Sequence, residues 1–117
     1  MKISSKKTIL IDLDGVLNEY TGQFDENFIL HIKDGALDFI RNLSADYKVK
    51  IFTSRNLLLA SEWVIKNELA EYIDDVTNIK TPCYLFVDDR CIKFNGNYKE
   101  LRTQIDSFNV WFKQYNS

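Results

Sequence analysis

Two aspartates, two residues apart, follow the first strongly apolar segment of the chain. Asp12 and Asp14 stand in the run ILIDLDG at positions 9–15. In an extended chain, residues two apart project to the same side, so both carboxylates face one way while Leu13 faces the other. Gly15 then permits a tight turn that brings the main chain close to a ligand. The pattern indicates an oxygen-rich site at the end of a strand.

Two further apolar segments also end in polar residues. These residues are Thr53, Ser54 and Arg55 after the second segment, and Asp88 and Asp89 after the last. The carboxyl ends of strands in an open parallel sheet share one edge, and ligands collect there. We therefore expect all three groups to converge at one rim.

Close carboxylates repel each other when ionised, so such a cluster needs a cation or raised pKa values. Mg²⁺ is the natural candidate, because it is a hard ion that takes oxygen ligands and shares them with substrate phosphates. We predict that Asp12, Asp14, Asp88 and Asp89 hold it.

Other residues near these positions suit phosphoryl oxygens. Thr53 and Ser54 supply hydroxyl donors, Lys80 supplies a positive charge, and Arg55 could clamp a phosphate with two parallel hydrogen bonds. Arg55 could equally form a structural ion pair. An anionic phosphorylated substrate together with a divalent cation is the simplest joint interpretation.

Alternating strand and helix patterns must position these residues. We expect strands at 7–13, 48–53, 75–77 and 83–87, and helices at 34–43, 56–69 and within 98–115. Asp34 is placed to cap the first helix, and the aromatic tail is expected to cover the sheet. This order predicts a single domain over residues 1–117. Its fold class is α/β, a three-layer α/β/α sandwich with a mostly parallel Rossmann-like sheet.

At this point the sequence resembles the haloacid dehalogenase-like (HAD) superfamily, over about residues 7–96. The first family motif is a strand ending in DxDG, here at 12–15. The second is matched by Thr53, the third best by Lys80, with Lys66 or Lys93 as alternatives, and the fourth by the acids at 88–89. The run 88–97 is similar to the corresponding run in a subgroup of small members of this superfamily. This similarity leaves the substrate open.

The resemblance implies a phosphatase and assigns roles. Asp12 would attack phosphorus and carry an aspartyl-phosphate, and Asp14 would act as general acid and base. Thr53 and Lys80 would hold the transferring group. Magnesium would be held by Asp12, the Asp14 carbonyl and Asp88, with Asp89 as a weaker ligand or an orienting residue.

The spacing of the motifs leaves no room for a cap domain. About 38 residues separate Asp14 from Thr53, and 26 separate Thr53 from Lys80. Water exclusion would then fall to the loop 18–27, a neighbouring subunit or a bulky substrate. The substrate could be a small molecule or the phosphorylated end of a macromolecule, and a homo-oligomer is an open possibility.

The composition limits the classes of partner that the chain is expected to bind. The net charge of −2 gives no basic field, so strong non-specific nucleic-acid binding is not expected. No apolar run approaches the ~20 residues of a membrane span, and no signal-peptide core follows residues 1–7. We expect a cytoplasmic protein without membrane contact.

Two other functions are compatible with an acidic pocket plus Thr and Lys. One is a non-enzymatic receiver-like signalling module, in which paired acids end the first strand and the phosphorylated Asp ends a later one. Here DxDG comes first and the paired acids come last, which is the reverse order. The other is a catalytically silent family member that only binds phosphate.

Overall fold

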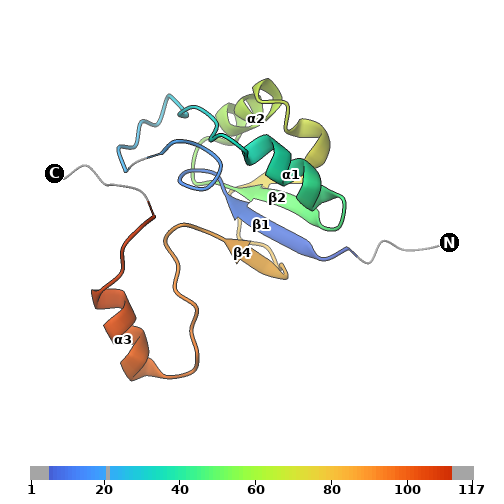
Figure 1. Ribbon diagram of the computed structural model, residues 1–117. Coiled ribbons are helices and arrows are strands. Elements are labelled where there is room, and N and C mark those ends of the chain that lie inside the picture. The colour runs from blue at the N-terminus through green and yellow to red at the C-terminus, as the bar shows by residue number, and fades with distance from the viewer. Residues whose placement is uncertain (1–5, 21, 112–117) are drawn as a thin grey trace.

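The computed structural model describes residues 6–20 and 22–111, and in it helices pack on one parallel β-sheet (Figure 1). The elements in chain order are β1 (Thr8–Asp12), α1 (Ala36–Ser44), β2 (Lys48–Phe52), α2 (Leu57–Lys66), the 3-10 helix η1 (Ala70–Tyr72), β3 (Asp75–Thr77), β4 (Leu85–Val87) and α3 (Tyr98–Asp106). The four strands lie in the order β3-β2-β1-β4, and all pairs are parallel. The predicted α/β architecture with a Rossmann-like sheet is confirmed.

β1 lies inside the sheet because it is apolar on both faces. Ile9, Leu10 and Ile11 are all buried, at most 4% exposed, as expected for a strand covered on both sides. Its register pairs Asp12 with Phe52 of β2, and Ile11 with Val87 of β4. All the strands are parallel, so the residues that follow them emerge at one edge of the sheet.

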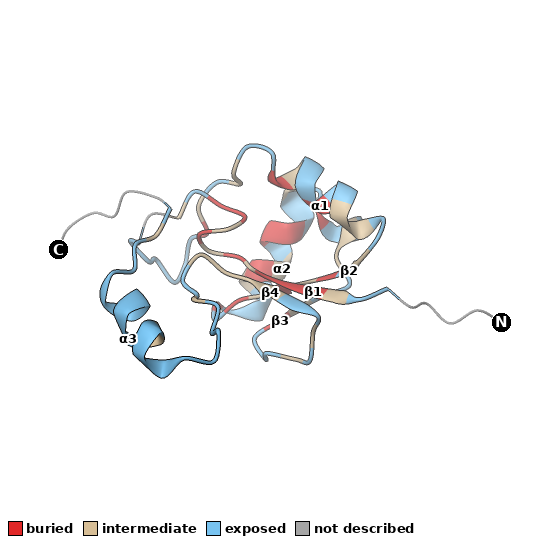
Figure 2. Ribbon diagram, turned by 60° about the horizontal axis from the view of Figure 1, so that its bottom comes forward, coloured by how far each residue is buried: buried red, intermediate tan, exposed pale blue. Residues whose placement is uncertain are grey.

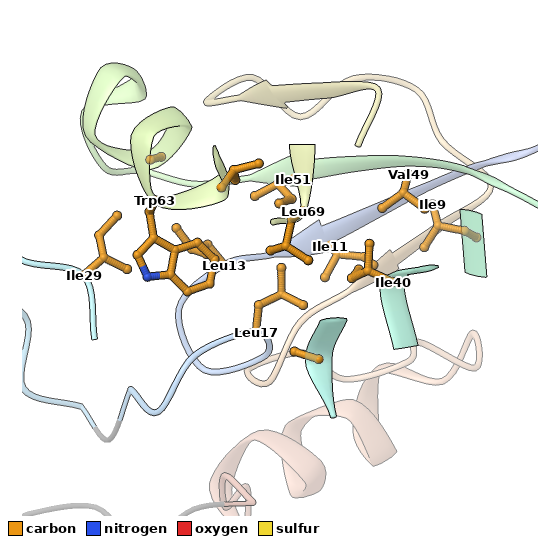
Figure 3. Close-up of a cluster of buried hydrophobic side chains, with 13 residues drawn as sticks. Ile9, Ile11, Leu13, Leu17, Ile29, Ile40, Val49, Ile51, Trp63 and Leu69 are labelled. Carbon is orange, nitrogen blue, oxygen red and sulfur yellow. The ribbon is translucent and has the colours of Figure 1, made fainter. Parts of the chain in front are cut away.

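One face of the sheet carries the core. The side chains of Ile9 and Ile11 on β1 and of Val49 and Ile51 on β2 cluster with residues of both α1 and α2 (Figure 3). Each fully buried aliphatic side chain of this kind contributes about 1.5–3 kcal/mol relative to exposure. The cluster therefore fixes β1 and β2, and with them the residues at their carboxyl ends.

The opposite face is more open. Leu10 is fully buried there, beside Phe52 and Phe86, whose ring centroids lie 5.5 Å apart in an edge-to-face arrangement. The predicted helix in the tail is present as α3, but the prediction that it packs on the sheet is wrong. α3 buries none of its residues and stands apart from the sheet (Figure 2). Four of its nine residues are charged, and Ile105 is 54% exposed.

The aromatic residues after α3 are also exposed where the structure describes them. Phe108 and Trp111 are 39% and 55% exposed, so the expected core role is wrong for both. Phe112 and Tyr115 lie outside the described residues. Among the described residues, no helix has the length and apolarity that crossing a bilayer requires.

The helix starts were predicted with mixed success. α2 begins next to the predicted start at 56, and Asn56 is its N-cap, because the Asn56 side chain accepts a hydrogen bond from the Leu59 N–H at 3.1 Å. The prediction that Asp34 caps α1 is wrong. The N-cap of this helix is Gly35, which lies in the left-handed region at φ 87°. A chain turning with positive φ favours glycine at that position.

The exposure of α3 predicts how two isoleucines respond to truncation. Ile40→Ala, in α1, should lower the free energy of unfolding by about 2–5 kcal/mol because the side chain is fully buried. Ile105→Ala, in α3, should change it by no more than about 0.5 kcal/mol. Urea unfolding of both variants measures this, and equal losses would show that α3 packs on the sheet.

Candidate active site

Three carboxylates meet where β1 and β4 end. One oxygen each from Asp12, Asp88 and Asp89 lies within 4.8 Å of the others. Asp12 is the last residue of β1, and Asp88 directly follows β4, the parallel neighbour of β1. An Asx turn fixes the Asp88 carboxylate, which accepts a hydrogen bond from the Arg90 N–H at 3.0 Å. The predicted convergence of these three acids is confirmed.

This cluster places negative charge in a poorly solvated position. Burial, together with the charges of Asp88, Asp89 and Asp14, raises the pKa of Asp12 from its ordinary value of 3.8 to about 8. Burial and the neighbouring Asp88 also raise the pKa of Asp89. Both shifts show that the site disfavours a full set of ionised carboxylates, which is the condition that a bound cation relieves.

The packing of Asp89 fits a cation site. Its Oδ2 is buried and has no hydrogen-bond partner among the described residues, an arrangement that is costly unless another ligand binds that atom. Its carboxylate also lies against Gly15, where a Cβ would be only 2.7 Å from Asp89 Cγ. The donors are all oxygen, which suits Mg²⁺.

Asp14 does not belong to this carboxylate cluster. Its Oδ2 accepts a hydrogen bond from Arg55 Nε at 2.7 Å, and its Oδ1 accepts one from Arg55 Nη2 at 3.0 Å. Its Oδ1 also accepts a hydrogen bond from Asn18 Nδ2 at 2.8 Å. The nearest charged partner of Asp14 is thus a guanidinium, whereas the sequence suggested acidic neighbours.

Arg55 serves this ion pair and does not line the cavity beside the carboxylates. Its side chain is 1% exposed. Nη1 donates to the carbonyls of Asp25 at 2.6 Å and Phe28 at 3.3 Å. Of the two interpretations left open by the sequence, the structure supports the ion pair, and the assignment of Arg55 to phosphate binding is wrong. Asp14 and the 19–28 loop already use four of its hydrogen bonds.

Of the other residues predicted to bind phosphate, Ser54 lines the cavity, whereas Thr53 and Lys80 do not. Ser54 is exposed and lines the cavity. Thr53 is 1% exposed, and its Oγ1 accepts a hydrogen bond from the Arg55 N–H at 3.0 Å, which shapes the turn. Lys80 is exposed, does not line the cavity, and places Nζ 5.0 Å from the ring centroid of Phe86. Phe86 precedes Asp88 by two residues, so Lys80 lies near the rim but outside the cavity.

The cavity beside the carboxylates has a volume of about 240 Å³ and is lined by Asp12, Asp14, Tyr20, Phe24, Ser54, Asp88, Asp89 and Arg90. Larger hollows of about 390 and 360 Å³ lie elsewhere, the second beside Lys48 at the start of β2. The cavity at the carboxyl ends of the strands is the one that α/β sheets use for ligands, and it contains the carboxylate cluster.

Two residues at the site were not foreseen. Asn18 is fully buried, and its Oδ1 accepts hydrogen bonds from the N–H groups of Gly15 and Tyr20, each at 3.1 Å. Trp111 Nε1 donates to the Gly15 carbonyl at 2.7 Å, which ties the end of the described chain to the turn after β1. The only sequence signal for Asn18 was a turn-forming residue just after DxDG. Trp111 had no signal, because its spacing suited a packed helix.

Comparison with known proteins bears on the fold alone. No family model matches the chain, and no curated protein matches its sequence. The solved structure of a conserved protein from Bacteroides thetaiotaomicron is similar, with a TM-score of 0.59 and 16% identity. The alignment covers 97% of this chain and 100% of that one. This likeness supports the α/β fold over the length of the chain.

The raised pKa of Asp12 predicts a pH-dependent stability. The folded protein keeps a proton that the unfolded chain releases between the ordinary pKa of 3.8 and about 8. The unfolded state binds fewer protons in this window, so the free energy of unfolding of the metal-free protein should fall as pH rises through it. Urea unfolding at several pH values should show a shallower fall for Asp12→Asn, and parallel curves would contradict the shift.

The contact between Gly15 and Asp89 predicts a specific loss of cation binding. Gly15→Ala should weaken Mg²⁺ binding in calorimetry, because its Cβ would displace the Asp89 carboxylate. Gly35→Ala is the matched control, since Gly35 has φ +87° against +89° at Gly15 but nothing within 4 Å of its Cβ position. Both variants bear similar backbone strain. Equal Mg²⁺ affinity in the two would count against Asp89 as part of the cation site.

Proposed function

We propose that this chain is a magnesium-dependent phosphomonoester hydrolase of the HAD type that acts through an aspartyl-phosphate on Asp12. The observation that carries the proposal is the meeting of the Asp12, Asp88 and Asp89 carboxylates within 4.8 Å at the carboxyl ends of adjacent parallel strands. The motif order and this grouping support the same interpretation. The fold alone would not, because one fold hosts many functions.

Asp12 is well placed to be the nucleophile. It ends the interior strand β1, whose residues 9–11 are buried, so its position is set by a rigid element. In the first step a carboxylate oxygen of Asp12 bonds to phosphorus while the bond from phosphorus to the ester oxygen breaks. Asp14 gives the leaving oxygen its proton. The products of this step are an alcohol and a phosphorylated Asp12.

The second step restores the enzyme. A water oxygen attacks phosphorus, the bond to Asp12 breaks, and Asp14 takes the proton of that water. Inorganic phosphate then leaves. Asp14 lines the cavity with Asp12, as a residue that serves both steps must.

Asp12, Asp88 and the backbone carbonyl of Asp14 would hold Mg²⁺, with Asp89 as a ligand or an orienting residue. When bound, the ion supplies positive charge that offsets the repulsion between the carboxylates and an anionic substrate. The unpartnered Oδ2 of Asp89 and the all-oxygen donor set support this assignment.

The remaining cavity wall bears on the substrate. Ser54 can donate a hydrogen bond to the phosphoryl group, and Lys80 stays the proposed third-motif lysine although it lies over Phe86. Tyr20 and Phe24 form an aromatic side of the cavity, where the leaving group would lie. The substrate is proposed to be a small phosphate ester or a phosphorylated macromolecular end. The cytoplasmic location and a homo-oligomer stay predictions.

The nucleophile assignment predicts the effect of one substitution. Asp12→Asn should lower the Mg²⁺-dependent hydrolysis of p-nitrophenyl phosphate by at least about 10³-fold, since an amide is a far weaker nucleophile. Asp74→Asn is the control, because Asp74 is exposed and lines the separate hollow beside the start of β2. Activity that persists in Asp12→Asn would sink the proposal. A wild-type protein without turnover would favour a silent phosphate-binding member, and stable phosphate on another aspartate would favour a receiver-like module.

A further inference from the structure

Arg55 joins two parts of the site that are far apart in sequence. Its guanidinium makes paired hydrogen bonds to both oxygens of Asp14, 41 residues away, at 2.7 and 3.0 Å. Through Nη1 it also holds the carbonyls of Asp25 and Phe28 in the 19–28 loop. One side chain therefore restrains both the carboxylate assigned to proton transfer and the loop beside the cavity.

The loop also contacts Arg55 through an aromatic ring. Phe24, which lines the cavity, has its ring centroid 4.5 Å from Arg55 Cζ. A guanidinium stacks well on an aromatic face, and it is favoured further where water is excluded. The wall of the cavity on this side is thus positioned partly by Arg55.

Arg55 is itself held in place by hydrogen bonds within the protein. The Thr53 hydroxyl accepts its N–H at 3.0 Å, which fixes the backbone at the end of β2. Asn18 supports the arrangement from the other side, because it donates to Asp14 Oδ1 and accepts from the Tyr20 N–H at the start of the loop. The geometry is that of a preorganised unit, with the acid/base residue and the loop fixed together.

We propose that Arg55 is the positioning residue that sets the orientation of Asp14 and the position of the 19–28 loop together, so that proton transfer to the leaving group depends on it. This inference rests on the proposed function for the role of Asp14. Arg55 does not line the cavity, so it acts through Asp14 and the loop and not on the substrate.

A lysine cannot replace this arrangement. Its ammonium is a point charge on a flexible stem, whereas the pairing to Asp14 and the two carbonyls uses the fixed fork of the guanidinium. Arg55→Lys keeps the charge but should lose the alignment. The matched control is Arg102→Lys, because Arg102 also pairs with both oxygens of an aspartate, Asp106, yet its side chain is 78% exposed on α3.

Two substrates separate a positioning role from a general structural one. An alkyl phosphate has a poor leaving group that needs protonation, whereas p-nitrophenolate leaves with little help. Arg55→Lys should lower kcat/KM, which reports the step that forms the aspartyl-phosphate, by roughly 10²-fold for the alkyl phosphate, the lower end of what a positioned general acid supplies, and by less than about threefold for p-nitrophenyl phosphate. Adding guanidinium to Arg55→Ala should restore part of the alkyl phosphate rate, as the missing fork is supplied from solution.

Other kinetic outcomes overturn the inference. Equal losses of kcat/KM on both substrates would overturn it: with a raised KM and unchanged kcat they would mean that Arg55 binds phosphate directly, and otherwise that Arg55 only maintains the fold. Thermal unfolding shows whether each variant is folded. If Arg55→Ala does not fold, the Arg55→Lys comparison decides alone.

The loop provides a measurement that does not need turnover. Hydrogen exchange of the segment 22–30 should speed up several-fold in Arg55→Lys and stay unchanged in Arg102→Lys. Unchanged exchange in Arg55→Lys would overturn the coupling. Wild-type protein that hydrolyses neither substrate would refute the proposed function, while the exchange result would still decide whether Arg55 holds the loop.

Discussion

The repulsion among three half-buried carboxylates is the constraint around which this site is organised. Asp12 and Asp88 are brought together because β1 and β4 are parallel neighbours, and Asp89 completes the group. The sheet brings these carboxylates to within 4.8 Å of one another, and burial together with the neighbouring charges raises the pKa of Asp12. A cation, a proton or both must offset the repulsion. The turn at Gly15 leaves room for the Asp89 carboxylate and so keeps the group in place.

The fourth acid, Asp14, has a different electrostatic environment from the other three. Asp14 has its own cation in Arg55, a built-in partner that is 1% exposed. Of the described residues that line the cavity, Arg90 is the one cation beside the other three carboxylates. Asp14 is therefore paired within the protein, whereas the carboxylates of Asp12, Asp88 and Asp89 lie close to one another. Pairs of acids with different environments are the usual basis for different roles in one site.

Much of this site could be predicted from the sequence, because it depends on local patterns. An apolar β-rich run followed by Asp12 indicates a buried strand with its acid at the ligand edge, and the run before Asp88 indicates a strand that ends at the same edge. Contacts between distant parts of the chain were harder to predict. A guanidinium suits a phosphate as well as a carboxylate, so nothing local tied Arg55 to Asp14. Periodicity predicted α3, yet it could not say what the helix would pack on.

The central claim is that Asp12 carries the phosphoryl group during turnover. It is tested most directly by mixing the protein rapidly with substrate and Mg²⁺, quenching in acid and mapping phosphate on peptides by mass spectrometry. Phosphate is expected on the peptide that contains Asp12, and hydroxylamine, which cleaves acyl phosphates, should remove it. Phosphate found on Thr53, Ser54 or Asp88, or turnover with no phosphorylated peptide at any quench time, would contradict the account.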